Sequence, residues 1–184
     1  MILAPERLET RRLTLRKPRV RDARAVTEAY AGDAETTRYL MFRPHRDIRE
    51  TRMFLRQAKA FWNMGTVFTW AITLKENGRL IGMIDARMEG CHANLGYVLS
   101  REYWNKGYMS EAVAAVTEWA LALHGIYRVW AVCDTENAAS ARVLEKVGMT
   151  REGILRRWVV LPNRSETPRD CYCYAIVKRT AADV

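Results

Sequence analysis

The apolar positions in the first third of the chain indicate one strand followed by helices. Leu13 and Leu15 alternate with polar neighbours, which predicts a short strand over residues 12–16. Glycine, proline and aspartate then separate segments in which apolar residues recur every three or four positions. These segments predict helices over residues 21–31, 33–40 and 47–63.

The pattern changes to a period of two in the middle of the chain, where Asn77-Gly78 is a hairpin turn signal. The last third alternates between strand and helix patterns. We expect strands over residues 67–75, 80–88, 92–99, 127–133, 153–161 and 170–177, and helices over 110–124 and 137–147. This order predicts a three-layer α/β domain on a mixed sheet, with residues 1–184 forming a single domain.

Composition places the chain among ordinary globular proteins, with 184 residues, 49% of them hydrophobic and 28% charged. It contains no apolar run of roughly 18 residues, so we expect no transmembrane helix. The N-terminal segment lacks the apolar stretch of a secretory signal, and we therefore expect a cytoplasmic protein. Four cysteines have spacings that do not suit a metal site, so we expect structural thiols and no metal: Cys91, Cys133, Cys171 and Cys173.

The net charge of +9 is the one unusual bulk property. A basic excess favours a polyanionic partner, such as nucleic acid, an anionic surface or a phosphorylated ligand. A single basic cluster is also compatible with a simple solvated face.

A strand that runs into a polar loop and then a helix carries the clearest chemical signal. The loop contains one glycine, Gly107, just before the helix is expected to begin. The first N–H groups of a helix lack partners within it and lie at the positive end of its dipole, so this junction suits pyrophosphate. The motifs of P-loops and dinucleotide-binding folds are absent. A lone glycine here is also compatible with an ordinary tight turn.

A second polar segment follows the buried strand over 127–133. Asn137 suits a helix N-cap, and Ser140 lies one turn further on. The Ser140 hydroxyl could point into the space beside that strand, or it could face solvent as an ordinary helix serine.

These two segments together resemble the GNAT superfamily of acetyl-CoA-dependent N-acetyltransferases, and in particular its RimJ/RimL-type branch, which acetylates N-terminal amines of ribosomal proteins. The residues that carry the resemblance are Gly96-Tyr97-Val98-Leu99, Tyr103-Trp104, Lys106-Gly107-Tyr108, Glu111-Ala112, Asn137-x-x-Ser140 and Val143 to Met149. The resemblance implies a three-layer α/β/α domain around a mostly antiparallel seven-stranded sheet. In that sheet the fourth and fifth strands splay apart.

The resemblance also implies how acetyl-CoA binds, without any metal. Pantetheine would lie in the gap between the splayed strands and bond the backbone near Tyr97, Val98 and Leu99. Asn137 would help to hold the cofactor, and the Ser140 hydroxyl would protonate the departing thiolate. The pyrophosphate would rest on the backbone amides of six consecutive residues: Asn105, Lys106, Gly107, Tyr108, Met109 and Ser110.

The sequence departs from the family pattern at four positions. Trp104 and Met109 replace residues of the pyrophosphate loop, although backbone amides would do the binding there. Leu144 stands where many members have a tyrosine acid, which makes Ser140 the better candidate for the acid. Asn94 stands where many branch members have a glutamate. It cannot act as a base, but it could orient a water molecule or the amine.

Acetyl transfer to an amine needs a group that takes up a proton at some stage, unless the amine arrives neutral. Six side chains are candidates for this base: Glu35, Asp85, Glu89, Asp134, His45 and His92. Each could equally be a surface, capping or packing residue. Tyr172 and Tyr174 are expected to pack or to line the acceptor site.

The expected acceptor is a protein N-terminus, ribosomal or other, and a monomer or homodimer is expected. A small-molecule amine is the first alternative, and the +9 charge weakly disfavours a strongly cationic one. A degenerate acyl-CoA-binding or regulatory domain is the second, since Asn94 and Leu144 replace obvious acid and base positions. A nucleic-acid-binding module is the third, without a recognisable motif of that class.

Overall fold

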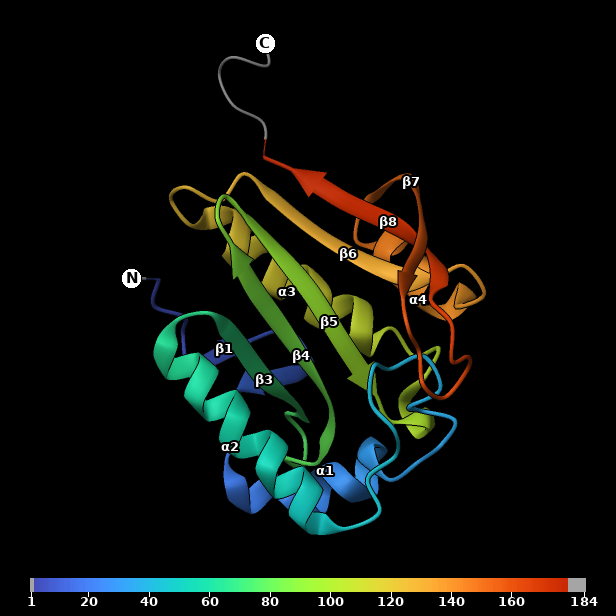
Figure 1. Cartoon of the computed structure of the whole chain (residues 1–184). Coiled ribbons are helices and arrows are strands. Elements are labelled where there is room, and N and C mark those ends of the chain that lie inside the picture. The colour runs from blue at the N-terminus through green and yellow to red at the C-terminus, as the bar shows by residue number, and fades with distance from the viewer. Residues whose placement is uncertain (1, 179–184) are drawn as a thin grey trace.

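The computed structural model describes residues 2–178 (Figure 1), so Met1 and residues 179–184 of the expected domain lie outside the described part. The strands, in chain order, are β1 (Arg7–Glu9), β2 (Leu13–Arg16), β3 (Val67–Leu74), β4 (Leu80–Glu89), β5 (His92–Leu99), β6 (Arg128–Asp134), β7 (Thr150–Val159) and β8 (Arg169–Val177). The longer helices are α2 (Ile48–Met64), α3 (Tyr108–Ala122) and α4 (Ala138–Lys146).

All eight strands form one sheet in the order β1-β2-β3-β4-β5-β6-β8-β7. Only β5 and β6 pair in parallel; every other neighbouring pair is antiparallel. The α/β class and the mixed sheet are confirmed, but the expected number of seven strands is wrong by one. The strand not predicted is β1, whose three residues pair with β2 but have two exposed side chains and therefore leave little hydrophobic pattern.

Helices cover the two faces of the sheet unequally (Figure 1). On one face, Ala112, Val113 and Val116 of α3 pack into the main core with residues of β2 to β6. On the other face, a smaller core joins α2 to β3 and β4. This second core also contains residues of the short helical segments α1 (Ala23–Val26) and η2 (Thr27–Ala31). The 3₁₀ segment η1 (Val20–Asp22) comes directly before α1. Figure 1 shows no helix in front of β6 and β8 among the drawn elements of residues 2–178.

Two helix predictions need correction. Residues 21–31 are helical, but the path changes from 3₁₀ to α to π along its length. Residues 33–40 form turns and no helix. Asp33 accepts the Thr36 N–H at 2.6 Å through its carboxylate, and the Thr37 hydroxyl donates to the Asp33 carbonyl at 2.8 Å. These local side-chain bonds compete with helical ones, which explains why a capping residue did not start a helix here.

Within residues 2–178, no helix has the length and apolar character that crossing a membrane would need.

Candidate active site

The sheet opens between its two parallel strands. Pairing of β5 with β6 begins at His92 and Arg128 and stops at Asn94 and Trp130, although β5 continues to Leu99 and β6 to Asp134. On its other edge, β5 stays paired with β4 as far as Leu99. The last five residues of β5 therefore border a gap toward β6. The family resemblance implied this gap between the fourth and fifth strands of a seven-stranded sheet, which are β5 and β6 here.

A loop with left-handed backbone leads from this gap into α3. Asn105 has φ 59° and Gly107 has φ 77°, and α3 starts at Tyr108. A methyl group built at Gly107 would lie 3.4 Å from Nη2 of Arg12 and 3.8 Å from Nζ of Lys146. The start of α3 is thus flanked by two cations from distant parts of the chain, which is the charge that a pyrophosphate needs.

Arg12 is fixed in this position by Glu111, in the first turn of α3. Glu111 accepts hydrogen bonds from the backbone N–H and from Nε of Arg12, both at 2.7 Å. Arg12 Nη1 also donates to the Lys106 carbonyl at 3.0 Å. Burial opposes ionisation of Glu111, but bonds from Thr10 and Arg12 outweigh it and lower its pKa. The carboxylate therefore stays charged and orients the arginine.

The two residues that depart from the loop pattern have structural contacts. The Trp104 indole N–H donates to the Leu99 carbonyl at 2.7 Å, so that carbonyl is already used as an acceptor. Met109 is buried in the main core and turned away from the loop surface. The bulk at these two positions is thus accommodated within the protein.

A hydroxyl pair spans the gap on the α4 side. The Tyr97 hydroxyl of β5 lies 2.8 Å from Oγ of Ser140 and 3.3 Å from its carbonyl oxygen. Asn137 caps α4, because its Oδ1 accepts the Ser140 N–H at 3.1 Å. Burial raises the pKa of Tyr97, so its proton stays available as a donor. Leu144, which replaces the tyrosine acid of the family pattern, is fully buried.

Asp85, Arg87 and Asn94 form a polar group on the opposite side of the sheet from Ser140. Arg87 donates to Oδ2 of Asp85 at 3.1 Å and to Oδ1 of Asn94 at 3.0 Å. The Asn94 amide nitrogen makes a long contact of 3.5 Å to the Trp130 carbonyl, at the point where β5 and β6 part. Burial raises the pKa of Asp85 to about 6, against the opposing effects of Arg87 and the Gly96 N–H.

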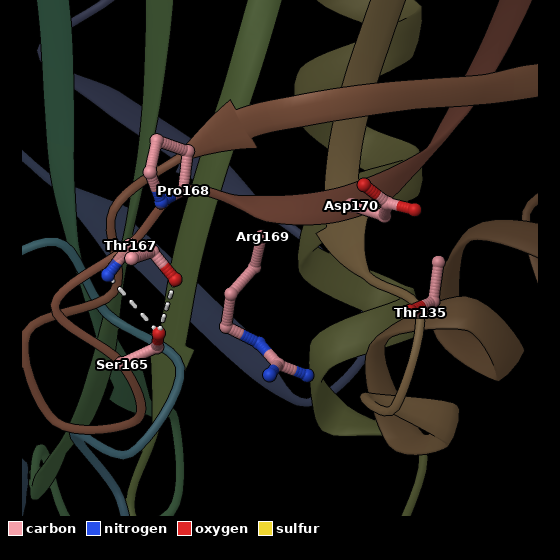
Figure 2. Close-up of a pocket in the computed structure, with 6 residues that line it drawn as sticks. All are labelled: Thr135, Ser165, Thr167, Pro168, Arg169 and Asp170. Carbon is pink, nitrogen blue, oxygen red and sulfur yellow. Dashed lines mark hydrogen bonds between the residues drawn. The ribbon is translucent and has the colours of Figure 1, made fainter.

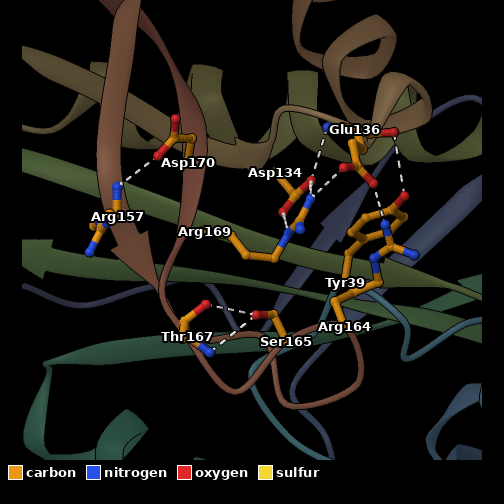
Figure 3. A network of polar contacts seen from close by, with 9 residues as sticks. All are labelled: Tyr39, Asp134, Glu136, Arg157, Arg164, Ser165, Thr167, Arg169 and Asp170. Atoms are coloured by element: carbon orange, nitrogen blue, oxygen red, sulfur yellow. Dashed lines mark hydrogen bonds and ion pairs between the residues drawn. The ribbon is translucent and has the colours of Figure 1, made fainter.

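Asp134 at the end of β6 lies in a denser network (Figure 3). Arg169 binds both of its carboxylate oxygens, at 2.5 and 3.1 Å, and the Glu136 N–H donates to it at 2.9 Å. Burial opposes ionisation of Asp134, but these bonds outweigh it and hold the pKa below its usual value. Glu136 also pairs with Arg164 and Arg169, and Tyr39 donates to its carbonyl at 3.4 Å.

The segment over residues 160–168, between β7 and β8, lies beside this network. A cavity of about 280 Å³ lies between this segment and the turn after β6. Figure 2 shows the side chains around it. Its lining residues are Thr135, Ser165, Thr167, Pro168, Arg169 and Asp170. Asn163 ties the same segment to the loop before α2, because its amide nitrogen donates to the carbonyls of Thr37 at 2.8 Å and Phe42 at 2.7 Å.

The other candidate bases lie in less suitable places. The side chains of Glu35 and Glu89 are 48% and 47% exposed. His45 Nδ1 is hydrogen-bonded to Thr51 at 2.8 Å, and burial lowers its pKa. His92 Nδ1 lies 3.7 Å from Glu89. Among the six candidates, only Asp85 and Asp134 therefore combine a sheltered carboxylate with a position beside the gap.

Tyr172 and Tyr174 pack against the core next to α4. Tyr174 is buried and donates to Oε1 of Glu145 at 2.8 Å, while the Arg151 guanidinium lies over the Tyr172 ring. Of the two alternatives left open by the sequence, these contacts favour packing.

Four contacts at the site had no local signal in the sequence. Arg12 and Lys146 reach Gly107 from far along the chain, and the Tyr97 hydroxyl reaches Ser140 across the gap. The pairing of the carboxylate of Glu111 with Arg12 was not predicted either. Only a contact map could have revealed these groupings.

Comparison with known protein families matches most of the chain to one family of enzymes. The model of the family described as "Acetyltransferase (GNAT) domain" matches residues 12–150. An uncharacterized N-acetyltransferase of Bacillus subtilis, YoaA, is 32% identical over 174 residues, which cover 93% of this chain and 96% of the relative. An uncharacterized N-acetyltransferase of Bacillus licheniformis, p20, is 31% identical over 180 residues, covering 96% and 99%.

Solved structures share the fold. A GNAT-family acetyltransferase from Bacillus anthracis superposes with a TM-score of 0.80 at 30% identity, over 93% of this chain and 98% of that one. The ribosomal L7/L12 α-N-protein acetyltransferase RimL, in complex with coenzyme A, gives a TM-score of 0.84 at 20% identity, over 94% and 98%.

Proposed function

The chain belongs to the GNAT acetyltransferase family, and on that premise we propose that it acetylates the N-terminal α-amino group of a protein or peptide. The chain is an acetyl-CoA-dependent N-acetyltransferase. The identity of the acceptor and the roles of individual residues are the proposal.

One observation carries the cofactor side of the proposal: the β5–β6 gap ends at a left-handed loop between two cations. The backbone amides of residues 105–110 would hold the pyrophosphate, with Arg12 and Lys146 beside them. The glycine matters because any side chain at Gly107 would enter the space between these cations. The edge of β5 at Tyr97, Val98 and Leu99 would hold the pantetheine, with Asn137 capping the helix on the far side.

Bound acetyl-CoA supplies a thioester as the acyl donor. Backbone N–H groups on the free edge of β5 would orient its carbonyl and stabilise the charge that develops on oxygen. Ser140 would donate a proton to the departing sulfur, and the Tyr97 hydroxyl at 2.8 Å would support that donation. Asn94, tied to Arg87, would help to shape the acceptor side of the gap.

The open face beside the gap supports a peptide acceptor over a small amine. Trp158 is 50% exposed, and its ring lies 6.5 Å from that of Trp130, the residue at which β5 and β6 part. The two rings meet edge to face at 70°, and the exposed Trp158 ring suits contact with a side chain of a peptide that lies across the sheet. A small cationic amine would need an enclosed acidic pocket, whereas the carboxylate nearest this part of the gap, Asp85, is paired with the Arg87 guanidinium.

A RimL structure determined with coenzyme A has this fold, and its name describes an α-N-protein acetyltransferase. At 20% identity the likeness concerns the fold, so the acceptor has to be tested directly.

The test combines calorimetry with a thiol-release assay. We expect acetyl-CoA to bind the wild type and turnover to be faster on short peptides with free N-termini than on polyamines or aminoglycosides. N-terminally blocked peptides with the same sequences are the control. If a small amine proves the best acceptor, or if blocked peptides react equally well, the peptide assignment is wrong.

A variant separates cofactor binding from folding. Gly107→Ala adds one methyl group at φ 77°, which we expect to weaken acetyl-CoA binding at least about tenfold while the domain stays folded. Gly78→Ala, at φ 70° in the β3–β4 turn with no atom near the added methyl, is the matched control. Unchanged affinity in the Gly107 variant would contradict the pyrophosphate assignment.

A further inference from the structure

The Asp85 carboxylate lies over the backbone of the opened part of β5. Asp85 of β4 pairs in register with Gly96 of β5, two residues beyond the last residue that β5 pairs with β6. A methyl group built at Gly96 would lie 3.1 Å from Oδ1 of Asp85 and 3.1 Å from Nη2 of Arg87. The absence of a side chain at Gly96 thus lets both charged groups reach the edge of the gap.

The two oxygens of this carboxylate have different surroundings. Oδ2 accepts from Arg87, whereas Oδ1 is buried without a hydrogen-bond partner among residues 2–178. A buried carboxylate oxygen without a partner is costly and rare in folded proteins, so its retention calls for a functional reason. The Gly96 N–H lies close enough to lower the pKa of this carboxylate, but it makes no hydrogen bond of normal geometry to Oδ1, which therefore keeps an acceptor position for a proton.

Arg87 connects this carboxylate to Asn94 at the start of the gap. Its guanidinium also donates to Asn94, so the carboxylate and the amide are held side by side. The Arg87 side chain is 42% exposed and that of Asp85 is 23% exposed, so the group reaches the surface on the face not covered by α3. Oδ1 itself is covered, so a proton from an acceptor on that face would reach it through a water molecule.

We propose that Asp85 is the general base of the acetyl transfer, with Oδ1 accepting the amine proton through one water molecule. The inference rests on the proposed placement of the thioester in the β5–β6 gap. The amine nitrogen forms its bond to the acetyl carbon and loses one proton to Oδ1. The carbon–sulfur bond breaks, the sulfur keeps the electron pair, and the Ser140 hydroxyl gives it a proton. Asp85 then releases its proton to solvent, and Ser140 regains one.

The electrostatic surroundings of Asp85 agree with this role. Burial raises its pKa to about 6, so the group is ionised at pH 7 but basic enough to accept a proton. The charged or titratable groups that face it are Arg87 on its own strand and Tyr30 of η2, whose pKa is raised by burial and by Asp85. Thr69 of β3 and Gly96 of β5, its partners in register, carry no charge.

The decisive experiment compares Asp85→Asn with the wild type on the best acceptor found in the panel. We expect kcat to fall about a hundredfold or more at pH 7, with unchanged acetyl-CoA affinity by calorimetry. The acid limb near pH 6 in the profile of kcat/KM should disappear. Glu89→Gln, an exposed carboxylate on the same strand, is the matched control and should keep wild-type kinetics. Activity within threefold of wild type in Asp85→Asn overturns the assignment.

The pH profile separates a base from a merely structural carboxylate. Arg87→Gln removes the cation that lowers the pKa of Asp85, so the acid limb should move to higher pH. A limb that stays in place in this variant contradicts the role of Arg87 as a positioning residue.

A measurement on the resting enzyme needs no turnover. The carboxyl ¹³C resonance of Asp85, assigned by its absence in Asp85→Asn, should titrate near pH 6. A value below about 4.5 overturns the proposal, because so weak a base could not compete for the proton. If a small amine is the best acceptor, the peptide assignment fails while the Asp85 test still runs on that amine, so the two failures are distinguishable.

Discussion

Asp85 and Asp134 are the same residue type on strands beside the same opening, yet their surroundings give them opposite properties. Both oxygens of Asp134 are bound by Arg169, and one also accepts a backbone N–H. Asp85 has one oxygen on Arg87 and one without a partner among the described residues. The pKa of Asp134 is therefore lowered and that of Asp85 is raised to about 6. Burial alone does not decide which carboxylate reacts; the number of donors around it does.

The largest stability difference should come from neutralising each aspartate in turn. Asp134→Asn removes a buried charge from a network built around it, so we expect the free energy of unfolding to fall by about 2–4 kcal/mol at pH 7.5. Asp85→Asn removes a buried negative charge whose loss of hydration is only partly offset by Arg87. This change should raise the free energy of unfolding by about 1–3 kcal/mol. Urea unfolding followed by tryptophan fluorescence measures both.

Two changes of the same sign in that experiment would contradict the contrast between the aspartates. Asp170→Asn is a useful control, since Asp170 also pairs with an arginine but at the exposed side chain of Arg156. We expect a change of no more than about 1 kcal/mol there.

The pH dependence of stability should have opposite signs at the two sites. The folded-state pKa of Asp85 lies above its unfolded value of 3.8, so its contribution to stability is greatest below that value and is lost as pH rises toward about 6. The folded-state pKa of Asp134 is depressed, so its contribution is present above the unfolded value and is lost on acidification. The stability gain of Asp85→Asn should therefore vanish near pH 3.5 and reach its full size above pH 6.

Urea midpoints of the wild type and the two variants between pH 3.5 and 8 provide this test. A gain in Asp85→Asn that does not change over that range would mean that Asp85 ionises at its ordinary pKa in the folded protein.

The sequence alone could not separate these aspartates, although it predicted much of what surrounds them. The loop around Gly107 and the cap at Asn137 were predictable because they depend on neighbours in the chain. The partners of Asp85 and Asp134 depend on how strands pair, as with Arg169 at the start of β8, which lies 35 residues beyond Asp134 in the chain. The same reason explains why Arg12 and Lys146 were missed beside Gly107.

The errors in the fold have a local origin. The helix expected over residues 33–40 rested on a capping residue, but Asp33 and Thr37 make turn bonds instead. The strand β1 was missed because its residues are too few and too exposed to show a period. Pattern-based prediction was reliable where a long apolar period exists, as in α3 and β3, and weak where side chains bond to the nearby backbone.

The hydroxyl pair Tyr97 and Ser140 extends the comparison of the two aspartates to the other side of β5. Ser140→Ala should lower kcat about tenfold and leave the Kd of acetyl-CoA unchanged, because the lost hydroxyl acts only on the departing sulfur. Tyr97→Phe keeps the ring and the packing and should lower kcat less, about threefold. Steady-state kinetics with calorimetry on the same preparations measures both. Unchanged kcat in Ser140→Ala would remove this hydroxyl from the reaction.

The smallest expected effect tests whether the segment before β8, which lies next to the network around Asp134, also contributes to binding of the acceptor amine. Asn163 holds the loop before α2 by two hydrogen bonds to backbone carbonyls, at 2.7 and 2.8 Å. Asn163→Ala should lower the free energy of unfolding by about 1 kcal/mol. It should raise KM for the acceptor severalfold while KM for acetyl-CoA stays constant. Ser165→Ala, whose hydroxyl bonds only within its own loop at Thr167, is the matched control.

If KM for the acceptor does not respond to Asn163→Ala, this end of the molecule is structural only, and acceptor recognition lies with the exposed Trp158 and its neighbour Trp130. If KM rises in step with the loss of stability, the segment before β8 has a function in acceptor binding as well. By holding the loop before α2 through Asn163, it would fix the surroundings in which the amine reaches Asp85.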